Sequence, residues 1–138
     1  MQALPVSVDF FLATTNLNLA RWYVTTCQKY LCLDHWNIKV TNGTVDDGYA
    51  QVIRLTERDA EIQLDPKWWT ATPDEKREII AHELIHLHTW LLAELVPDSH
   101  ASARTEVEER LVDILAKAFA PFLPSWRSRS WKKKKDEE

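Results

Sequence analysis

The chain contains little glycine and little cysteine. Of its 138 residues, two are glycine and two are cysteine. So little glycine argues against a loop-rich fold or a β-sandwich and suits helices with short connections. Cys27 and Cys32 have a C-x4-C spacing, which fits neither a zinc knuckle nor a C-x-x-C redox pair. We therefore expect two buried free thiols and no disulfide.

Long apolar runs and a basic N-terminal region are also missing. The most apolar stretch near the start, residues 10–13, is short and is soon followed by Thr and Asn. A secretory signal needs a longer apolar core behind a positive charge, and a membrane-spanning helix needs about 20 apolar residues. The sequence predicts neither, so we expect a cytoplasmic protein with no membrane partner.

The charges are unevenly distributed along the chain. The last fifteen residues carry six basic and three acidic side chains, whereas the preceding 123 carry eleven basic and eighteen acidic. An acidic body argues against a nucleic-acid-binding surface, so we expect no nucleic-acid partner. The length predicts one domain over residues 1–123, followed by a charged, Trp-containing and flexible tail over residues 124–138.

Hydrophobic periodicity predicts an α+β fold. Helical spacing from Val6 to Leu33 indicates an N-terminal helix, which residues 14–16 could break into two pieces. Asn42-Gly43 is a strong turn signal. Alternating apolar and polar residues predict a small three-stranded antiparallel sheet. Its strands are expected at about Trp36–Val40, Tyr49–Leu55 and Ala60–Leu64.

Two further helices are predicted in the second half of the chain. Thr72 and Glu75 have the spacing of a capping box, with proline at the first helical position. The helix that begins there should run from Pro73 to about Glu94. A last helix should run from about Ser102 to Ala120, before a proline stops it.

An H-E-x-x-H motif lies in the first of these helices. His82 and His86 are one helical turn apart, so both imidazoles project from one face, as two ligands of one Zn²⁺ require. Glu83 lies between them, placed to act as general base on a metal-bound water. The flanking residues are apolar, and burying these polar groups without a partner would be costly. The motif therefore predicts a hydrolase with one Zn²⁺ per chain.

A catalytic zinc usually has three protein ligands and one open position, so a third ligand is needed. The last helix offers four acidic candidates, and three histidines compete with them. The acids are Glu106, Glu108, Glu109 and Asp113, and the histidines are His35, His88 and His100. Glu108 lies nearest the apolar stripe of the helix, and helix phase alone does not exclude it.

The segment from Glu109 to Asp113 resembles the E-x-x-x-D helix of the gluzincin metallopeptidases. The resemblance implies that Glu109 is the third metal ligand and that Asp113 supports His82. A ligating histidine commonly donates its other ring N–H to a carboxylate, which agrees with that role. Glu106 also has a distance from His86 typical of gluzincins, but no acid follows it four residues later. Glu106 and Glu108 stay open as alternatives.

The resemblance extends over about residues 36–120 and implies a minimal zincin-like domain. It is similar to the single-domain minigluzincins and to phage-encoded metallopeptidases. The chain departs from the larger gluzincins in having no second domain and no evident Tyr or His donor after the third ligand. The longer H-E-x-x-H-x-x-G-x-x-H pattern of metzincins is absent.

The resemblance implies a zinc-dependent peptidase, an endopeptidase in preference to an exopeptidase. A peptide or protein substrate would dock on the strand from Ala60 to Leu64, which we expect at the edge of the sheet. Trp126 and Trp131 in the tail could dock into the cleft and block it. The alternative function is a zinc-binding regulatory or interaction protein on the same scaffold, with little or no general proteolysis.

Overall fold

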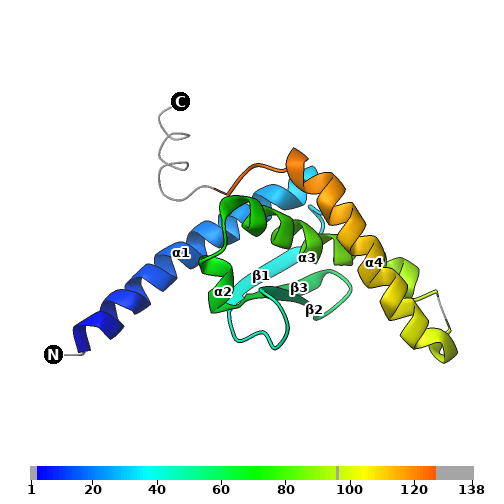
Figure 1. Cartoon of the computed structure of the whole chain (residues 1–138), viewed down its shortest axis with the longest axis horizontal. Helices are drawn as coiled ribbons and strands as arrows, with labels where there is room; N and C mark the ends of the chain where they lie inside the picture. The colour runs from blue at the N-terminus through cyan, green and yellow to red at the C-terminus, as the bar shows by residue number, and fades with distance from the viewer. Residues whose placement is uncertain (1–2, 96, 127–138) are drawn as a thin grey trace.

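The computed structural model describes residues 3–95 and 97–126 (Figure 1). Its elements are α1 (Ala3–Tyr30), β1 (Asn37–Asn42), β2 (Ala50–Arg54), β3 (Asp59–Leu64), α2 (Pro66–Trp69), α3 (Pro73–Ala93) and α4 (Ala101–Phe119). Two short 3₁₀ segments, Asp98–His100 and Ala120–Phe122, flank α4. The predicted α+β class is confirmed. Helix α1 continues unbroken through residues 14–16, and α2 was not predicted.

The sheet is mixed, with strand order β1-β3-β2. Strand β1 runs parallel to β3, and β2 runs antiparallel to it, so the predicted antiparallel sheet is wrong for one of its two pairings. The most deeply buried strand, β3, takes the centre: Ala60, Ile62 and Leu64 are at most 1% exposed. The connection over residues 43–49 carries the chain from β1 past β3 to β2. The Asn42-Gly43 pair therefore does not close a two-residue hairpin.

The helices cover one face of the sheet. Alternate residues of β3 are buried, as expected for a strand with one covered face. Helices α1 and α3 pack against β1 and β2, and α4 packs against α3 (Figure 1). Side chains from all these elements form one apolar core, which includes Tyr23, Val40, Ile62, Leu84 and Val112. This core fixes the position of α3 relative to the free edge of β2.

Helix α3 begins with the predicted capping box. The Thr72 backbone N–H donates to Oε1 of Glu75 over 2.9 Å, and the Glu75 N–H donates to Oγ1 of Thr72 over 3.1 Å. These two bonds satisfy donors that a helix start otherwise leaves unpaired. The start of the motif helix is thereby fixed at Pro73.

The two cysteines differ in environment. Cys27 is buried and free, as predicted. Cys32 is exposed, so its predicted burial is wrong. Its φ of 58° places it in the left-handed region just after α1 ends. The chain turns away from the helix there, and the thiol faces outward.

The folded body continues through Trp126, past the predicted boundary at residue 123. Trp126 is 6% exposed and packs edge-to-face on Tyr23 and Trp68, with ring centroids 5.4 and 5.1 Å apart. The Tyr23 hydroxyl donates to the carbonyl oxygen of Pro124 over 2.7 Å. Trp126 is thus a core residue, and the prediction that it docks into the cleft is wrong. Trp131 lies outside the described residues.

Within residues 3–95 and 97–126, no helix is both long and apolar enough to cross a membrane.

Candidate metal centre

Helices α3 and α4 lie side by side (Figure 1), and the candidate metal centre contains residues of both helices. His82 and His86 project from one face of α3, with ring centroids 5.0 Å apart and ring planes at 72°. His86 is 7% exposed and His82 is partly buried. The predicted pairing of the two imidazoles on one helix face is confirmed.

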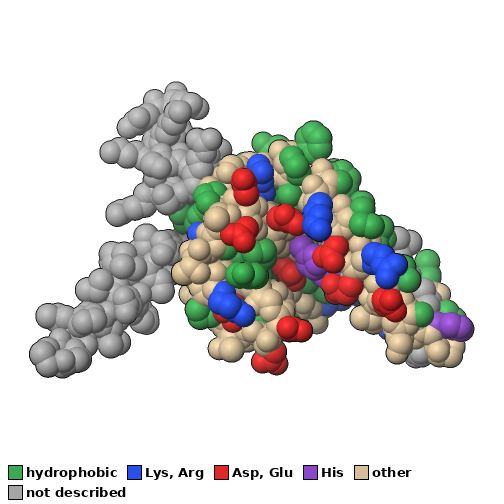
Figure 2. Space-filling model, in the orientation of Figure 1, with side chains coloured by type: hydrophobic (Ala, Val, Ile, Leu, Met, Phe, Trp, Pro, Cys, Tyr) green, Lys and Arg blue, Asp and Glu red, His purple; other side chains and the backbone are tan. Residues whose placement is uncertain are grey.

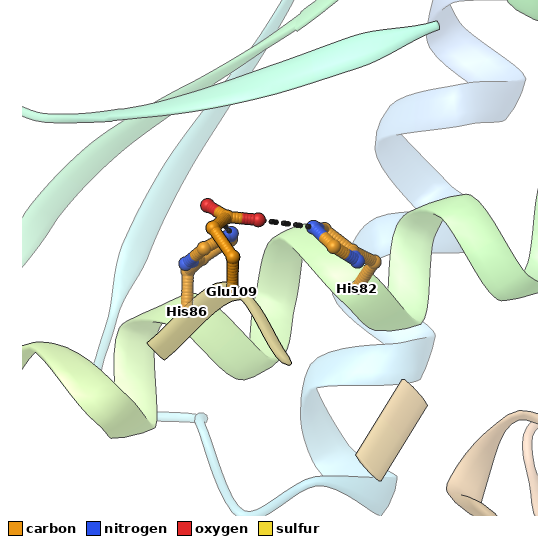
Figure 3. Close-up of side chains that lie close together, drawn as sticks. All are labelled: His82, His86 and Glu109. Carbon is orange, nitrogen blue, oxygen red and sulfur yellow. Dashed lines mark ion pairs between the residues drawn. The ribbon is translucent and has the colours of Figure 1, made fainter. Parts of the chain in front are cut away.

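The Glu109 carboxylate from α4 reaches both imidazoles (Figure 3). Its Oε2 lies 3.6 Å from Nε2 of His82, and its Oε1 lies 3.4 Å from Nε2 of His86. One ligand atom from each of the three residues can be chosen so that all lie within 4.8 Å of one another. Of the acidic candidates on α4, Glu109 is the one that this cluster contains.

The three side chains offer donor atoms that could hold a metal ion. Zinc binds imidazole nitrogen and carboxylate oxygen at about 2.0–2.2 Å, so tetrahedral ligand atoms lie roughly 3.3–3.6 Å apart. The two carboxylate-to-imidazole distances of 3.6 and 3.4 Å fall in this range, although each is measured to a different oxygen of Glu109. The set supplies three candidate ligand residues.

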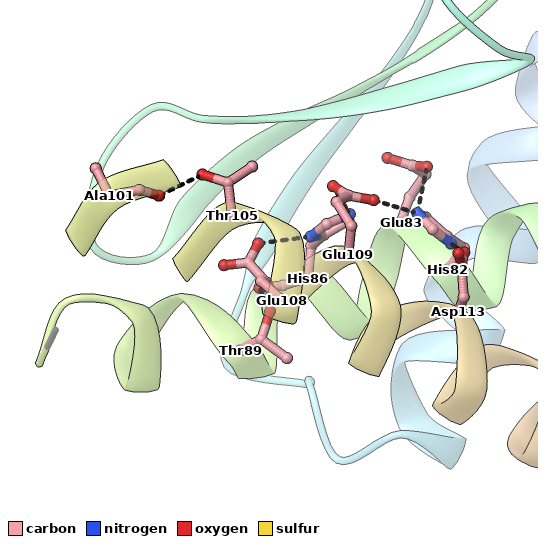
Figure 4. Close-up of polar contacts among 9 residues, drawn as sticks. All are labelled: His82, Glu83, His86, Thr89, Ala101, Thr105, Glu108, Glu109 and Asp113. Atoms are coloured by element: carbon pink, nitrogen blue, oxygen red, sulfur yellow. Dashed lines mark hydrogen bonds and ion pairs between the residues drawn. The ribbon is translucent and has the colours of Figure 1, made fainter. Parts of the chain in front are cut away.

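Two further carboxylates lie next to the Nδ1 atoms of the two histidines (Figure 4). Oδ1 of Asp113 lies 3.0 Å from Nδ1 of His82, and Oε1 of Glu108 lies 3.0 Å from Nδ1 of His86. With Nδ1 protonated, each imidazole donates to its carboxylate and keeps Nε2 free as a ligand atom. The expected contact of Asp113 with His82 is present in the structure.

The role of Glu108 was not predicted, although the residue was considered as a ligand. Glu108 and Glu109 are consecutive on α4, and they lie next to the two different ring nitrogens of His86, Nδ1 and Nε2. The Glu108 side chain is 17% exposed. The sequence signal was its place beside the apolar stripe, which predicts burial against α3.

The other candidate ligands lie outside the cluster. Glu106 is 74% exposed and pairs with Arg110 on its own helix. Nε2 of His88 is hydrogen-bonded to the carbonyl oxygen of Leu31, just after α1, over 2.6 Å. His100 precedes α4, nine residues before Glu109, which corresponds to about 13 Å of helix.

Glu83 lies on the sheet side of the centre, against β2. The residue is 8% exposed, and its Oε2 lies 3.9 Å from Nε2 of His82. Burial raises the pKa of the Glu83 carboxyl to about 8; a hydrogen bond from the Val52 backbone N–H opposes this rise, and the nearby Glu109 carboxylate adds to it. Burial, and then the proximity of His86, lower the pKa of His82, which favours the neutral ring that binds metal.

The edge strand nearest the site is β2, whereas β3 was expected at the edge. The Tyr49 carbonyl oxygen accepts a hydrogen bond from the backbone N–H of Asp65, directly after β3, and the Leu55 N–H donates to the carbonyl oxygen of Asp59 in β3. Antiparallel pairs alternate, so Ala50, Val52 and Arg54 point their backbone groups away from β3. The contact of Val52 with Glu83 places this free edge beside the centre.

Comparison with known proteins gives no relative to set beside this geometry. No model of a known protein family matches the chain, and neither a curated protein nor a solved structure matches it.

Proposed function

We propose that this protein is a small zinc-dependent peptidase of the gluzincin type. The observation that carries the proposal is the Glu109 carboxylate, 3.6 and 3.4 Å from Nε2 of His82 and His86, with Glu83 beside them. A zincin-like architecture is part of the proposal: a motif helix, a second helix with the third ligand, and an edge strand along the site. One Zn²⁺ per chain is the expected metal, because two imidazoles and one carboxylate with an open position are typical of catalytic zinc.

When bound, a zinc ion lowers the pKa of a coordinated water to about 7 and polarises the carbonyl of the scissile bond. Glu83 accepts a proton from the attacking water and passes it to the leaving amine nitrogen. Burial beneath β2 keeps bulk water away from the Glu83 carboxyl and raises its pKa, so that the carboxylate is a stronger base. His82 and His86 stay oriented through Asp113 and Glu108.

The substrate backbone is proposed to pair with the free edge of β2. Outward backbone groups at Ala50 and Arg54 can add an extended peptide as a further strand. This replaces the expected docking on β3, whose two edges are already paired. An edge strand binds an internal stretch of extended chain, which favours an endopeptidase.

The test is hydrolysis of casein and of a mixed peptide library, with zinc and with a chelator. Wild-type protein should cleave, and chelation should abolish cleavage. Glu83→Gln should keep about one zinc per chain but lose at least about a hundredfold in rate, as removal of a general base does. Zinc-loaded wild-type protein that cuts no peptide in the library would instead support a zinc-binding regulatory protein.

A further inference from the structure

A cavity of about 350 Å³ opens beside the candidate metal centre. His82 and Glu83 form part of its wall, together with the preceding two turns of α3 and the chain from Asp47 to Ala50. Its volume lies at the lower end of the range for ligand pockets, about 300–1,000 Å³. It therefore has room for one long side chain of a substrate bound along β2.

The wall of this cavity is acidic. Asp47, Glu75 and Glu78 line it, and none of the lining residues is Lys or Arg. Lys67 lies over the ring of Tyr49, with Nζ 5.8 Å from the ring centroid, but is not part of the wall. Figure 2 shows acidic side chains gathered around a histidine on this face of the molecule. The cavity thus presents negative charge next to the reacting centre.

The acidic side chains differ in how they are held. The Glu75 carboxylate accepts a hydrogen bond from the Thr72 backbone N–H, which lowers its pKa and keeps it ionised. Glu78 is exposed and lies one turn before His82 on α3. Within the described part of the chain no ion pair involves Glu78 or Asp47. Their charges are therefore available to a ligand.

The proposed mechanism determines which substrate residue lies next to this cavity. Glu83 passes its proton to the leaving amine, so that nitrogen must lie next to the Glu83 carboxyl. The residue that carries this amine is the one immediately after the scissile bond. Because Glu83 also forms part of the cavity wall, the side chain of that residue lies nearest the cavity.

We infer that the cavity selects a lysine or arginine side chain in the residue immediately C-terminal to the cleaved bond, with Glu78 as the main specificity-determining residue. Ile79 and Tyr49 offer apolar surface to the alkyl stem of such a side chain, and the acids meet its charged end. An aspartate or glutamate at this substrate position is repelled. The inference rests on the proposed peptidase function and adds its substrate class.

The experiment uses two quenched fluorescent peptides that differ only in that residue, lysine in one and norleucine in the other. Zinc-loaded wild-type protein should show a kcat/KM about fivefold or more higher for the lysine peptide, the size expected for a partly exposed ion pair. Raising the salt concentration should reduce this preference. Glu78→Gln should remove most of it, and Glu78→Lys should favour a third peptide, with glutamate at that position, over the lysine peptide.

Glu57→Gln is the matched control, because Glu57 is exposed and lies outside this cavity. It should leave the preference unchanged. If wild-type protein cuts both peptides equally well, the specificity inference is overturned while the peptidase proposal stands.

If neither peptide is cut, the peptidase proposal fails, and binding decides the inference separately. Isothermal titration of both uncleaved peptides into the zinc-loaded protein should then still show tighter binding of the lysine peptide, lost in Glu78→Gln. Equal affinities, or no binding of either peptide, would overturn the inference.

Discussion

The Glu108 carboxylate lies 3.0 Å from Nδ1 of His86, while Nε2 of the same ring faces Glu109. Adjacent glutamates on α4 therefore hold one imidazole from its two sides. Glu109 is the third member of the candidate metal cluster, and Glu108 fixes the tautomer and orientation of the ring. Asp113 holds His82 in the same way. The two histidines are thus prepared for metal by contacts with α4.

Removing the Glu108 carboxylate should weaken metal binding. Contacts of this kind typically contribute about 10–100-fold to metal affinity, so Glu108→Ala should raise the Kd for zinc by that factor. Glu108→Gln keeps an acceptor oxygen and should have a smaller effect. Competition with a chromophoric chelator measures the affinity. Glu106→Ala is the control, because Glu106 is 74% exposed and contacts Arg110 instead. Unchanged affinity in Glu108→Ala would show that the contact does not support the ligand.

Buried Glu83 should make the metal-free protein less stable as the pH rises. Its pKa is raised to about 8 in the folded chain, against about 4.3 in an unfolded one, so the folded state binds the proton more tightly. The resulting stability is fully present below about pH 4 and is lost as the pH rises towards 8. Its size is on the order of 5 kcal/mol.

Glu83→Gln removes this titration. Metal-free Glu83→Gln should therefore gain stability over wild type progressively between about pH 5 and pH 8, as measured by urea unfolding. Glu57→Gln, a substitution of an exposed glutamate, should show no such gain. A constant difference between wild type and Glu83→Gln across this range would contradict the predicted desolvation of Glu83.

Trp126 should contribute strongly to stability. It packs on Tyr23, Trp68 and Trp69, and the ammonium of Lys76 lies 5.2 Å from its ring. Replacing a buried tryptophan by alanine typically costs about 3–5 kcal/mol, so Trp126→Ala should lower the free energy of unfolding by that amount. Phe122→Ala, at a residue 76% exposed, is the control and should cost well under this.

Truncation separates this packing role from a role of the tail. A chain ending at Trp126 should keep wild-type stability, and a chain ending at Leu123 should lose about as much as Trp126→Ala. The remaining prediction is that Trp131 blocks the cleft. Hydrolysis of peptides by the chain that ends at Trp126 tests it. Faster cleavage than by the full chain would support a block, and an equal rate would contradict it.

The local features of the fold followed from the sequence. The capping box at Thr72 and Glu75 predicted the start of α3, and helical spacing predicted α1, α3 and α4 to within a few residues. These signals act over one or two helical turns, so a single chain contains them. The same holds for His82 and His86, whose common face follows from the period of the helix.

Strand order and tail packing did not follow from the sequence. Alternation in β1, β2 and β3 predicts a covered face for each strand but does not determine which strands pair. The central place of β3 depends on burying Ile62 between Val40 and Val52, a long-range choice. The polar residues around Trp126 indicated an exposed tail, whereas Tyr23 and Trp68, on which its ring packs, come together only in the folded protein.

The metal centre itself can be tested most directly by X-ray absorption at the zinc edge of the zinc-loaded protein, together with metal analysis. We predict one zinc per chain with two imidazole nitrogens and carboxylate or water oxygens at about 2.0–2.2 Å. Glu109→Gln should lose this environment or bind zinc far more weakly. Sulfur ligands at about 2.3 Å from Cys27 or Cys32, or the absence of bound zinc, would contradict the assignment of His82, His86 and Glu109.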